Sequence, residues 1–342
     1  MQNRELCLVI GMVSLLLSRL AGAQGYQWTE IVIPGTTVLQ AWQINDSGQV
    51  ALFTTDAGNG IYADGIFTPL PAPPEGIQSV APLGINNDGV ITGGAVTVAG
   101  DNRGFILRGS TYAIFSRPGW ANTFPRSISN SGLITGTTDD GAGGTAGFIY
   151  DPVTDTFTDA TPPGSFNHIV QGMNAFGRIT GHGNESPGIG RYGFVWQQGT
   201  ISQGERELRP FLARLKIADL GTATRGINDS GIVVGFTNEA TGENQGFVGN
   251  DASGYERLIA PGGEIAGNST ICSSINNLAQ VVCYVWDSTA TPLGAFIGSP
   301  ATGKGSAGAD KRPASTGAVV QRTNGTSVAR ALPNNLPARA LP

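Results

Sequence analysis

Few residues in this chain carry side chains that acid–base, nucleophilic or metal chemistry requires. Among its 342 residues, histidine occurs only twice, as His168 and His182. The spacings typical of serine hydrolases, zinc proteases and phosphate-binding loops do not occur. The turn Asp139-Asp140-Gly141 offers two carboxylates to Ca²⁺, but one acidic pair lacks the regular ligand spacing of a calcium loop. We therefore expect no cofactor, with Ca²⁺ at this turn as the alternative, and no catalytic residue or metal site is assigned.

Cys272 and Cys283 are the two cysteines that follow the N-terminal apolar segment. They lie symmetrically about the turn 276–279, so an antiparallel hairpin would place them face to face. This position predicts a structural disulfide, with two buried free thiols as the alternative. The same register, applied to the hairpin between His168 and His182, directs the two imidazoles to opposite faces of a sheet. A metal shared by them is therefore not expected.

The elements that position these residues follow a nine-residue pattern that recurs six times. The first copy begins at Ile44 and reads INDSGQV, with a degraded end. The other copies begin at Ile85, Ile128, Met173, Ile227 and Ile275. In each copy an apolar residue ends a strand, Asn, Asp and Ser favour a turn, and Gly supplies a positive φ. The spacing of 41 to 54 residues is typical of four-stranded propeller blades.

Two more apolar segments follow most copies, such as 104–107 and 112–115. After the copy at Met173, the fourth strand is expected at 215–218, and the extra residues 199–214 are expected to form a solvated loop or a short helix. The last copy has no fourth strand, whereas a spare strand at 28–33 precedes the first. We therefore predict an all-β, six-bladed β-propeller of four-stranded blades, the last blade closed by the N-terminal strand. The alternatives are a seven-bladed propeller and a β-solenoid.

Two sets of side chains are candidate ligand contacts in such a propeller. Connections between blades lie on one face of the frame, where binding residues commonly occur. The aromatic residues of these connections are Trp120, Phe124 and Phe166. Polar residues at equivalent positions of the innermost strands are expected at the central channel, as a site for a small ligand or an ion. They are Arg126, Gln171, Arg225 and Ser273.

The paired motifs, I-N-x-x-G-x-[IV]-x-G followed by a strand around Ala/Gly-Phe, resemble those of bacterial secreted proteins with HAF repeats. The resemblance covers residues 26–299. It departs from the family pattern where a His should precede Ala-Phe, since this chain has Arg103, Ala146, Tyr192, Gln245 and Gly294 there. The resemblance implies a repeat fold and secretion, and it carries over no catalytic residue.

Residues 1–23 have the pattern of a secretory signal peptide. An apolar stretch at 6–17 precedes Ala21-Gly22-Ala23, which is typical of a cleavage site. The stretch is shorter than the ~20 residues that a membrane-spanning helix needs. We expect residues 24–299 to form the propeller and residues 300–342 to form a disordered basic tail. The mature protein is then secreted, or periplasmic, without a membrane span.

The formal net charge of −5 comes from an acidic propeller and a basic tail. An acidic body argues against nucleic acid as a partner. Strong structural repeats without catalytic motifs indicate an extracellular binding or scaffold module for a glycan, a peptide or a cell-surface protein, and we expect a monomer. The alternative is a propeller enzyme acting on carbohydrate, a glycoside hydrolase or lyase, because paired carboxylates would meet only in three dimensions.

Overall fold

The computed structural model describes residues 25–164, 166–184, 191–197, 201–203, 206–208, 211–215 and 221–301. The side chains of residues 166, 167, 201–203, 206–208 and 211–215 lie outside this description. So do the expected signal peptide and all but the first two residues of the expected tail. The described part of the chain has no helix that could span a membrane.

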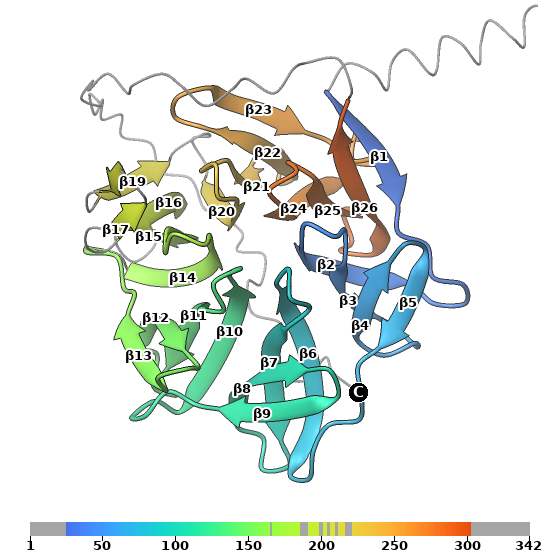
Figure 1. Cartoon of the computed structure of the whole chain (residues 1–342). Coiled ribbons are helices and arrows are strands. Elements are labelled where there is room, and N and C mark those ends of the chain that lie inside the picture. The colour runs from blue at the N-terminus through green and yellow to red at the C-terminus, as the bar shows by residue number, and fades with distance from the viewer. Residues whose placement is uncertain are drawn as a thin grey trace, which may run out of the picture.

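Six four-stranded antiparallel sheets stand around a common axis, so the fold is a six-bladed β-propeller (Figure 1). Blades are numbered here in chain order, and their strands run from the axis outward. Blade 1 contains β2 (Val38–Ile44), β3 (Val50–Thr54), β4 (Gly60–Ala63) and β5 (Ile66–Pro69). Blade 2 contains β6 (Ile77–Ile85), β7 (Ile91–Thr97), β8 (Asn102–Arg108) and β9 (Thr111–Phe115). Blade 3 contains β10 (Asn122–Ile128), β11 (Ile134–Asp139), β12 (Thr145–Asp151) and β13 (Thr156–Asp159).

Blades 4 to 6 follow the same order, except that blade 4 skips β17 and β18 and blade 6 takes its outermost strand from the N-terminal segment. Blade 4 contains β14 (Phe166–Met173), β15 (Ile179–Asn184), β16 (Arg191–Gln197) and β19 (Phe211–Leu215). Blade 5 contains β20 (Thr222–Ile227), β21 (Val233–Asn238), β22 (Asn244–Asn250) and β23 (Gly254–Leu258). Blade 6 contains β24 (Ser269–Ile275), β25 (Val281–Trp286), β26 (Pro292–Pro300) and, as its outermost strand, β1 (Tyr26–Glu30). Six blades exclude the seven-bladed and solenoid alternatives.

The prediction for the insertion in blade 4 is wrong in two respects. The fourth strand is β19 at 211–215 instead of 215–218, and it pairs with β16. The inserted residues contain a β-hairpin, β17 (Ile201–Gln203) with β18 (Arg206–Leu208), where a loop or short helix is expected. Alternating charges are compatible with a strand as well as a helix, so the charge pattern alone does not separate the two.

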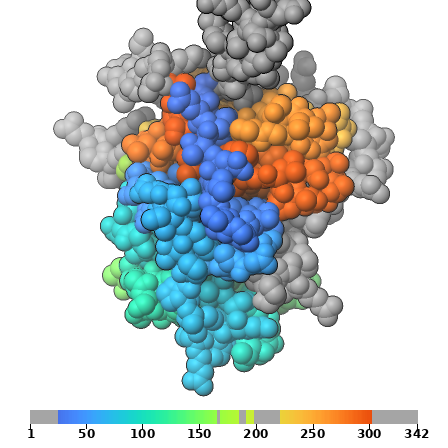
Figure 2. All heavy atoms as spheres, turned by 90° about the vertical axis from the view of Figure 1, so that its right-hand side faces the viewer, coloured from blue at the N-terminus to red at the C-terminus, as the bar shows by residue number. Residues whose placement is uncertain are grey.

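The N-terminal strand β1 runs antiparallel to β26, with Tyr26 opposite Pro300 and Glu30 opposite Phe296. Figure 2 shows this blue segment lying against the orange and red strands of blade 6. The first and last described segments therefore share one sheet.

The hydrophobic core lies between neighbouring blades. The Phe of the third-strand motif is the main contributor: Phe105, Phe148 and Phe194 are fully buried. Between blades 2 and 3, for example, Ile106 packs in one cluster with Ile128 and Phe148. The repeated Gly/Ala-Phe signal is thus a packing signal, because each blade buries its faces against the next.

In five of the six repeats, an Asn caps its own turn. Asn45 Oδ1 accepts hydrogen bonds from the main-chain N–H of Ser47 at 3.1 Å and of Gln49 at 2.9 Å. Gly48 adopts a φ of 77° in this turn, as the sequence predicts. The same bond, to the N–H four residues on, is made by Asn86, Asn174, Asn228 and Asn276.

The same asparagines also join neighbouring blades, which the sequence analysis did not anticipate. Asn45 Nδ2 donates to the carbonyl oxygen of Asn86 in blade 2 at 3.0 Å, and Asn276 Nδ2 in blade 6 donates to the carbonyl oxygen of Asn45 at 2.9 Å. The side chains that make this bond are Asn45, Asn86, Asn174, Asn228 and Asn276. Within the described residues the step from blade 3 to blade 4 lacks it, because blade 3 has Ser129 at this position.

A second ring of bonds, one residue further along each turn, is interrupted at the same step. Asp46 N donates to Asn87 Oδ1 at 2.8 Å, and Asn277 N donates to Asp46 Oδ1 at 2.8 Å. Blade 4 has Ala175 at the equivalent position, and its methyl group cannot accept the bond that Asn130 N would donate. Blades 3 and 4 are therefore joined by fewer turn bonds than any other described pair of neighbours.

Replacing Ser129 by asparagine should restore the missing amide bond to the carbonyl oxygen of Asn174. We expect Ser129→Asn to raise the free energy of unfolding by about 1 kcal/mol, the usual net value of one such bond. Urea unfolding followed by tryptophan fluorescence measures it. The matched control is Asn228→Ser at an intact step, which should lose at least as much. A loss of stability in Ser129→Asn would contradict this explanation of the gap.

Candidate functional site

A β-bulge interrupts every innermost strand at the same height. In β10 the pairing skips from Pro125 to Ser127, which leaves Arg126 as the extra residue. Such a bulge turns the extra side chain out of the regular strand alternation. The extra residues in the other innermost strands are Trp42 and Gln43, Leu83, Gln171, Arg225 and Ser273.

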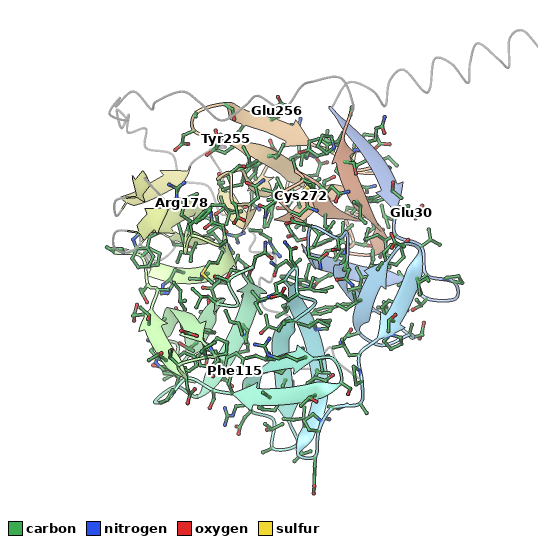
Figure 3. The ribbon with its side chains drawn as sticks, in the orientation of Figure 1. Glu30, Phe115, Arg178, Tyr255, Glu256 and Cys272 are labelled. Carbon is green, nitrogen blue, oxygen red and sulfur yellow. A yellow bond between two sulfur atoms is a disulfide. The ribbon has the colours of Figure 1, made fainter. Side chains whose placement is uncertain are left out.

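These bulged residues meet on the propeller axis, where they line one pocket. All six innermost strands contribute to its wall, and side chains from the inner strands fill the middle of the ring in Figure 3. The cavity volume is about 30 Å³, whereas one water needs ~10–15 Å³ on the same measure. The four residues predicted for a polar inner ring lie in this wall, together with Trp42, Gln43 and Leu83, which the sequence analysis missed. We call it the axial pocket.

Arg126 and Arg225 both lie over the indole of Trp42. The distance from Cζ to the ring centroid is 5.9 Å for Arg126 and 5.4 Å for Arg225. Arg225 also lies 5.3 Å from the ring centroid of Phe236 in blade 5. Arg191, from blade 4, lies 6.0 Å from the same ring. Three blades thus direct guanidinium groups toward aromatic faces beside the axis.

The surroundings of these cations are buried and positive. Burial, and then the charge of Arg225, lowers the pKa of Arg126 to about 10. Arg191 shows the same shift, to about 10, from the same two causes. Burial and the nearby arginines hold the pKa of His182 well below its usual value, so this imidazole is neutral at pH 7.

Several donors in and beside the pocket have no hydrogen-bond partner among the described residues. They are the Nε atoms of Arg126 and Arg225, Nη1 of Arg225 and Nε1 of Trp42, all of them buried. Both ring nitrogens of His182 are also buried without a partner. No Asp or Glu lies among the residues that line the pocket. The ion pairs Arg103–Asp101 and Arg117–Asp159 lie outside this wall.

Two other pocket residues are engaged in holding the ring together. The Oγ atom of Ser273 in blade 6 bonds to the carbonyl oxygens of Ala41 and Trp42 in blade 1. The Gln43 side chain reaches across the axis to blade 3, where Nε2 donates to the carbonyl oxygen of Ile128 at 2.9 Å. Oε1 of Gln43 accepts from Ile128 N at 3.2 Å. Ser273 therefore serves chiefly as a bridge between blades, whereas Gln171 lines the pocket.

A second hollow continues along the axis at the turn face, lined by the repeat turns of all six blades. Its charged members are Asp46 and Asp229. Both carboxylates accept hydrogen bonds from Asn277 Nδ2, at 3.1 and 2.9 Å. The axis is thus cationic at the bulges and acidic at the turns.

The aromatic residues predicted for a loop site do not form one cluster among the described side chains. Trp120 is half-buried and stacks with Arg117, whose Cζ lies 5.4 Å from its ring centroid. Phe124 is half-buried within β10, opposite Thr137. Phe166 begins β14, and its side chain lies outside the description. The ring contacts of the described residues include no pair of these three.

The acidic turn considered for Ca²⁺ uses its carboxylates to hold its own loop. Asp140 Oδ1 accepts from the N–H of Ala142 at 2.8 Å and of Gly144 at 2.9 Å. These main-chain bonds lower the pKa of Asp140. Asp139 Oδ1 accepts from Gly141 N at 2.9 Å. Among the described residues, no group of three or more His, Cys, Asp or Glu could hold a metal ion.

Cys272 and Cys283 are joined by a disulfide in blade 6 and are fully buried (Figure 3). They are register partners in β24 and β25, next to the bulge at Ser273. The disulfide thus braces the strand that carries one wall of the axial pocket.

The hairpin of blade 4 carries both histidines. His182 lies opposite Ile169, so the adjacent His168 points to the other face of the sheet.

No protein-family model matches the chain, and no curated protein matches it. Solved structures similar to it include a gluconolactonase from Xanthomonas campestris, at 9% identity over 82% of this chain and 92% of that chain, with a TM-score of 0.48. TolB from Acinetobacter baumannii has 12% identity over 85% and 68%, with a TM-score of 0.43. A lectin from Aleuria aurantia has 10% identity over 82% and 100%, with a TM-score of 0.39. Similarities of this degree carry no argument about a ligand or a reaction.

Proposed function

We propose that this chain is a secreted, non-catalytic binding module whose ligand is held on the propeller axis. The observation that carries the proposal is the convergence of bulged residues from all six innermost strands on one polar pocket. A rigid frame that directs Arg126, Gln171 and Arg225 to one point is suited to recognition of a small group. That group belongs to a glycan, a peptide or another cell-surface partner.

Export is part of this proposal. A signal peptide at residues 1–23 delivers the chain to an oxidising compartment, where the Cys272–Cys283 disulfide is stable. The resemblance to HAF-repeat proteins gives the same expectation. We also propose that β1 closes the ring, supported by its continuous pairing with β26 from Tyr26 to Glu30.

A library of immobilised glycans and peptides tests the binding proposal when probed with three proteins. The wild-type protein should bind a defined subset of the library. Gln171→Ala should weaken that binding, because Gln171 lines the axial pocket. Trp120→Ala, outside the pocket, is the matched control and should bind as the wild type does.

Two results would overturn the proposal. Loss of binding in Trp120→Ala with normal binding in Gln171→Ala would place the ligand at the loops between blades. Release of a cleaved product from a bound glycan would show the carbohydrate-active enzyme considered as the alternative.

A further inference from the structure

The axial pocket contains a charge that the described chain does not balance. Arg126 and Arg225 approach Trp42 from blades 3 and 5, and each carries a buried Nε donor without an acceptor. Guanidinium groups are donors only, and a buried donor without an acceptor is unfavourable. A buried cation is tolerated when an anion offsets it, and no carboxylate lines this wall.

The neighbouring groups add to the positive potential. Arg191 lies close enough to Arg225 for the two charges to oppose each other, and each lies within 6.0 Å of the Phe236 ring centroid. His182 contributes no charge at pH 7, and its buried ring nitrogens have no partner among the described residues.

The size of the pocket restricts what can sit there. A volume of about 30 Å³ has room for roughly two to three waters, and so for two or three heavy atoms of a ligand. A whole sugar ring does not fit into this volume, whereas a carboxylate, sulfate or phosphate group can place two or three of its heavy atoms there. Two guanidinium forks and an indole N–H match the several oxygen acceptors of such a group.

We infer that the axial pocket binds an oxyanion, held between Arg126 and Arg225 with Trp42 Nε1 as a third donor. This inference deepens the proposed function, since it names the chemical group that the pocket takes. Two sources supply that group: a free inorganic anion, or the acidic end of a larger molecule such as a sulfated or uronate-bearing oligosaccharide.

Calorimetric titration at constant ionic strength, kept with sodium chloride, tests the inference on the full mature chain. Sodium sulfate, phosphate and acetate are the probes, and at least one should bind with saturation. Arg126→Met and Arg225→Met should each weaken that affinity at least tenfold, the usual loss for a charge-assisted contact. Arg117→Met is the matched control, because Arg117 also stacks on a tryptophan but on the outer surface, and it should change the affinity less than twofold.

Thermal unfolding provides a second readout, because the unfolding midpoint can be measured even for a variant that has lost anion binding. The binding anion should raise the unfolding midpoint of the wild type and of Arg117→Met, and not those of the two pocket variants. The pocket variants should remain folded in chloride, since methionine removes a buried charge instead of adding one. No anion-dependent change in the wild type, or the same change in all four proteins, would overturn the inference.

A second arm identifies the source and separates this inference from the proposed function. A sulfated or uronate-bearing oligosaccharide that binds at least tenfold tighter than the free anion identifies a larger ligand and supports both. Equal affinity supports the oxyanion site with a free anion as its occupant, and would contradict the proposed partner. Binding of neutral glycans alone, unaffected by Arg126→Met, would support the module and refute the oxyanion site.

Discussion

Replacing Gly93 by alanine will lower the free energy of unfolding by about 3 kcal/mol or more, the upper range for overpacking a tight site. A Cβ atom at Gly93 would lie 1.9 Å from the carbonyl oxygen of Ala81 and 3.0 Å from Leu83 N. Both atoms belong to the main chain of the bulge in β6, which cannot shift without misdirecting Leu83. Urea unfolding followed by tryptophan fluorescence measures the loss.

The neighbouring residue provides the matched control. Gly94 has no atom within 4 Å of a Cβ position and no positive φ. Gly94→Ala should therefore leave stability unchanged or raise it by up to about 1 kcal/mol, because alanine restricts the unfolded chain. Equal losses in the two variants would show that the close approach to the bulge is not what requires glycine.

This glycine is the last residue of the repeat motif. The same close approach, to a main-chain oxygen of the innermost strand at 2.0–2.1 Å, occurs at Gly136, Gly181 and Gly235. Blades 1 and 6 carry Leu52 and Cys283 at this position, and Cys283 forms the disulfide there. The last glycine of the motif is thus required where the second strand packs closely on the bulge, which occurs in four of the blades.

Removing the N-terminal strand will have a still larger effect. A chain beginning at Pro34 lacks β1 and the buried Ile31, and it exposes the edge of β26. Burial of an Ile side chain contributes ~1.5–3 kcal/mol, and a domain has only ~5–15 kcal/mol in total. We expect this truncated chain to lose cooperative unfolding, measured by urea titration, and to associate through the open edge.

A rearranged chain tests whether blade 6 requires the strand β1 itself or its location at the N-terminal end of the chain. Gly25 and Ala301 are hydrogen-bonded neighbours, with Ala301 N donating to Gly25 O at 2.8 Å. Residues 25–33 attached after Ala301 through a short turn would therefore form an ordinary hairpin with β26. This variant should regain the unfolding midpoint of the wild type. A truncated chain as stable as the full one would contradict ring closure by β1.

The parts of the fold that local physics determines could be predicted from the sequence. The turn glycines take their positive φ because that conformation depends on near neighbours in the chain. The burial of the third-strand phenylalanines depends on the neighbouring blade as well. The fourth strand of blade 4 was misplaced, since its hairpin insertion has no repeat signal to align it. Ala279 has a φ of 58° in the last turn, where the other copies have glycine, so the backbone there overrides the residue type.

The candidate site was predictable only in part. Equivalent spacing brought out Arg126, Gln171 and Arg225, because they precede the repeat turns by a fixed number of residues. The same spacing of two residues places Trp42 before Ile44 and Leu83 before Ile85, but a selection of polar residues leaves them out. The contact of both arginines with the Trp42 indole could not be predicted, since it depends on how blades 1, 3 and 5 meet at the axis. The bonds from each turn asparagine to the next blade were missed for the same reason.

A crystal of the protein soaked in sodium selenate would locate a bound anion directly. We expect an anomalous selenium peak on the propeller axis, within hydrogen-bond distance of the guanidinium groups of Arg126 and Arg225. The peak should disappear in crystals of Arg225→Met. Selenium peaks confined to the outer surface, with ordered water alone between the two arginines, would contradict this expectation.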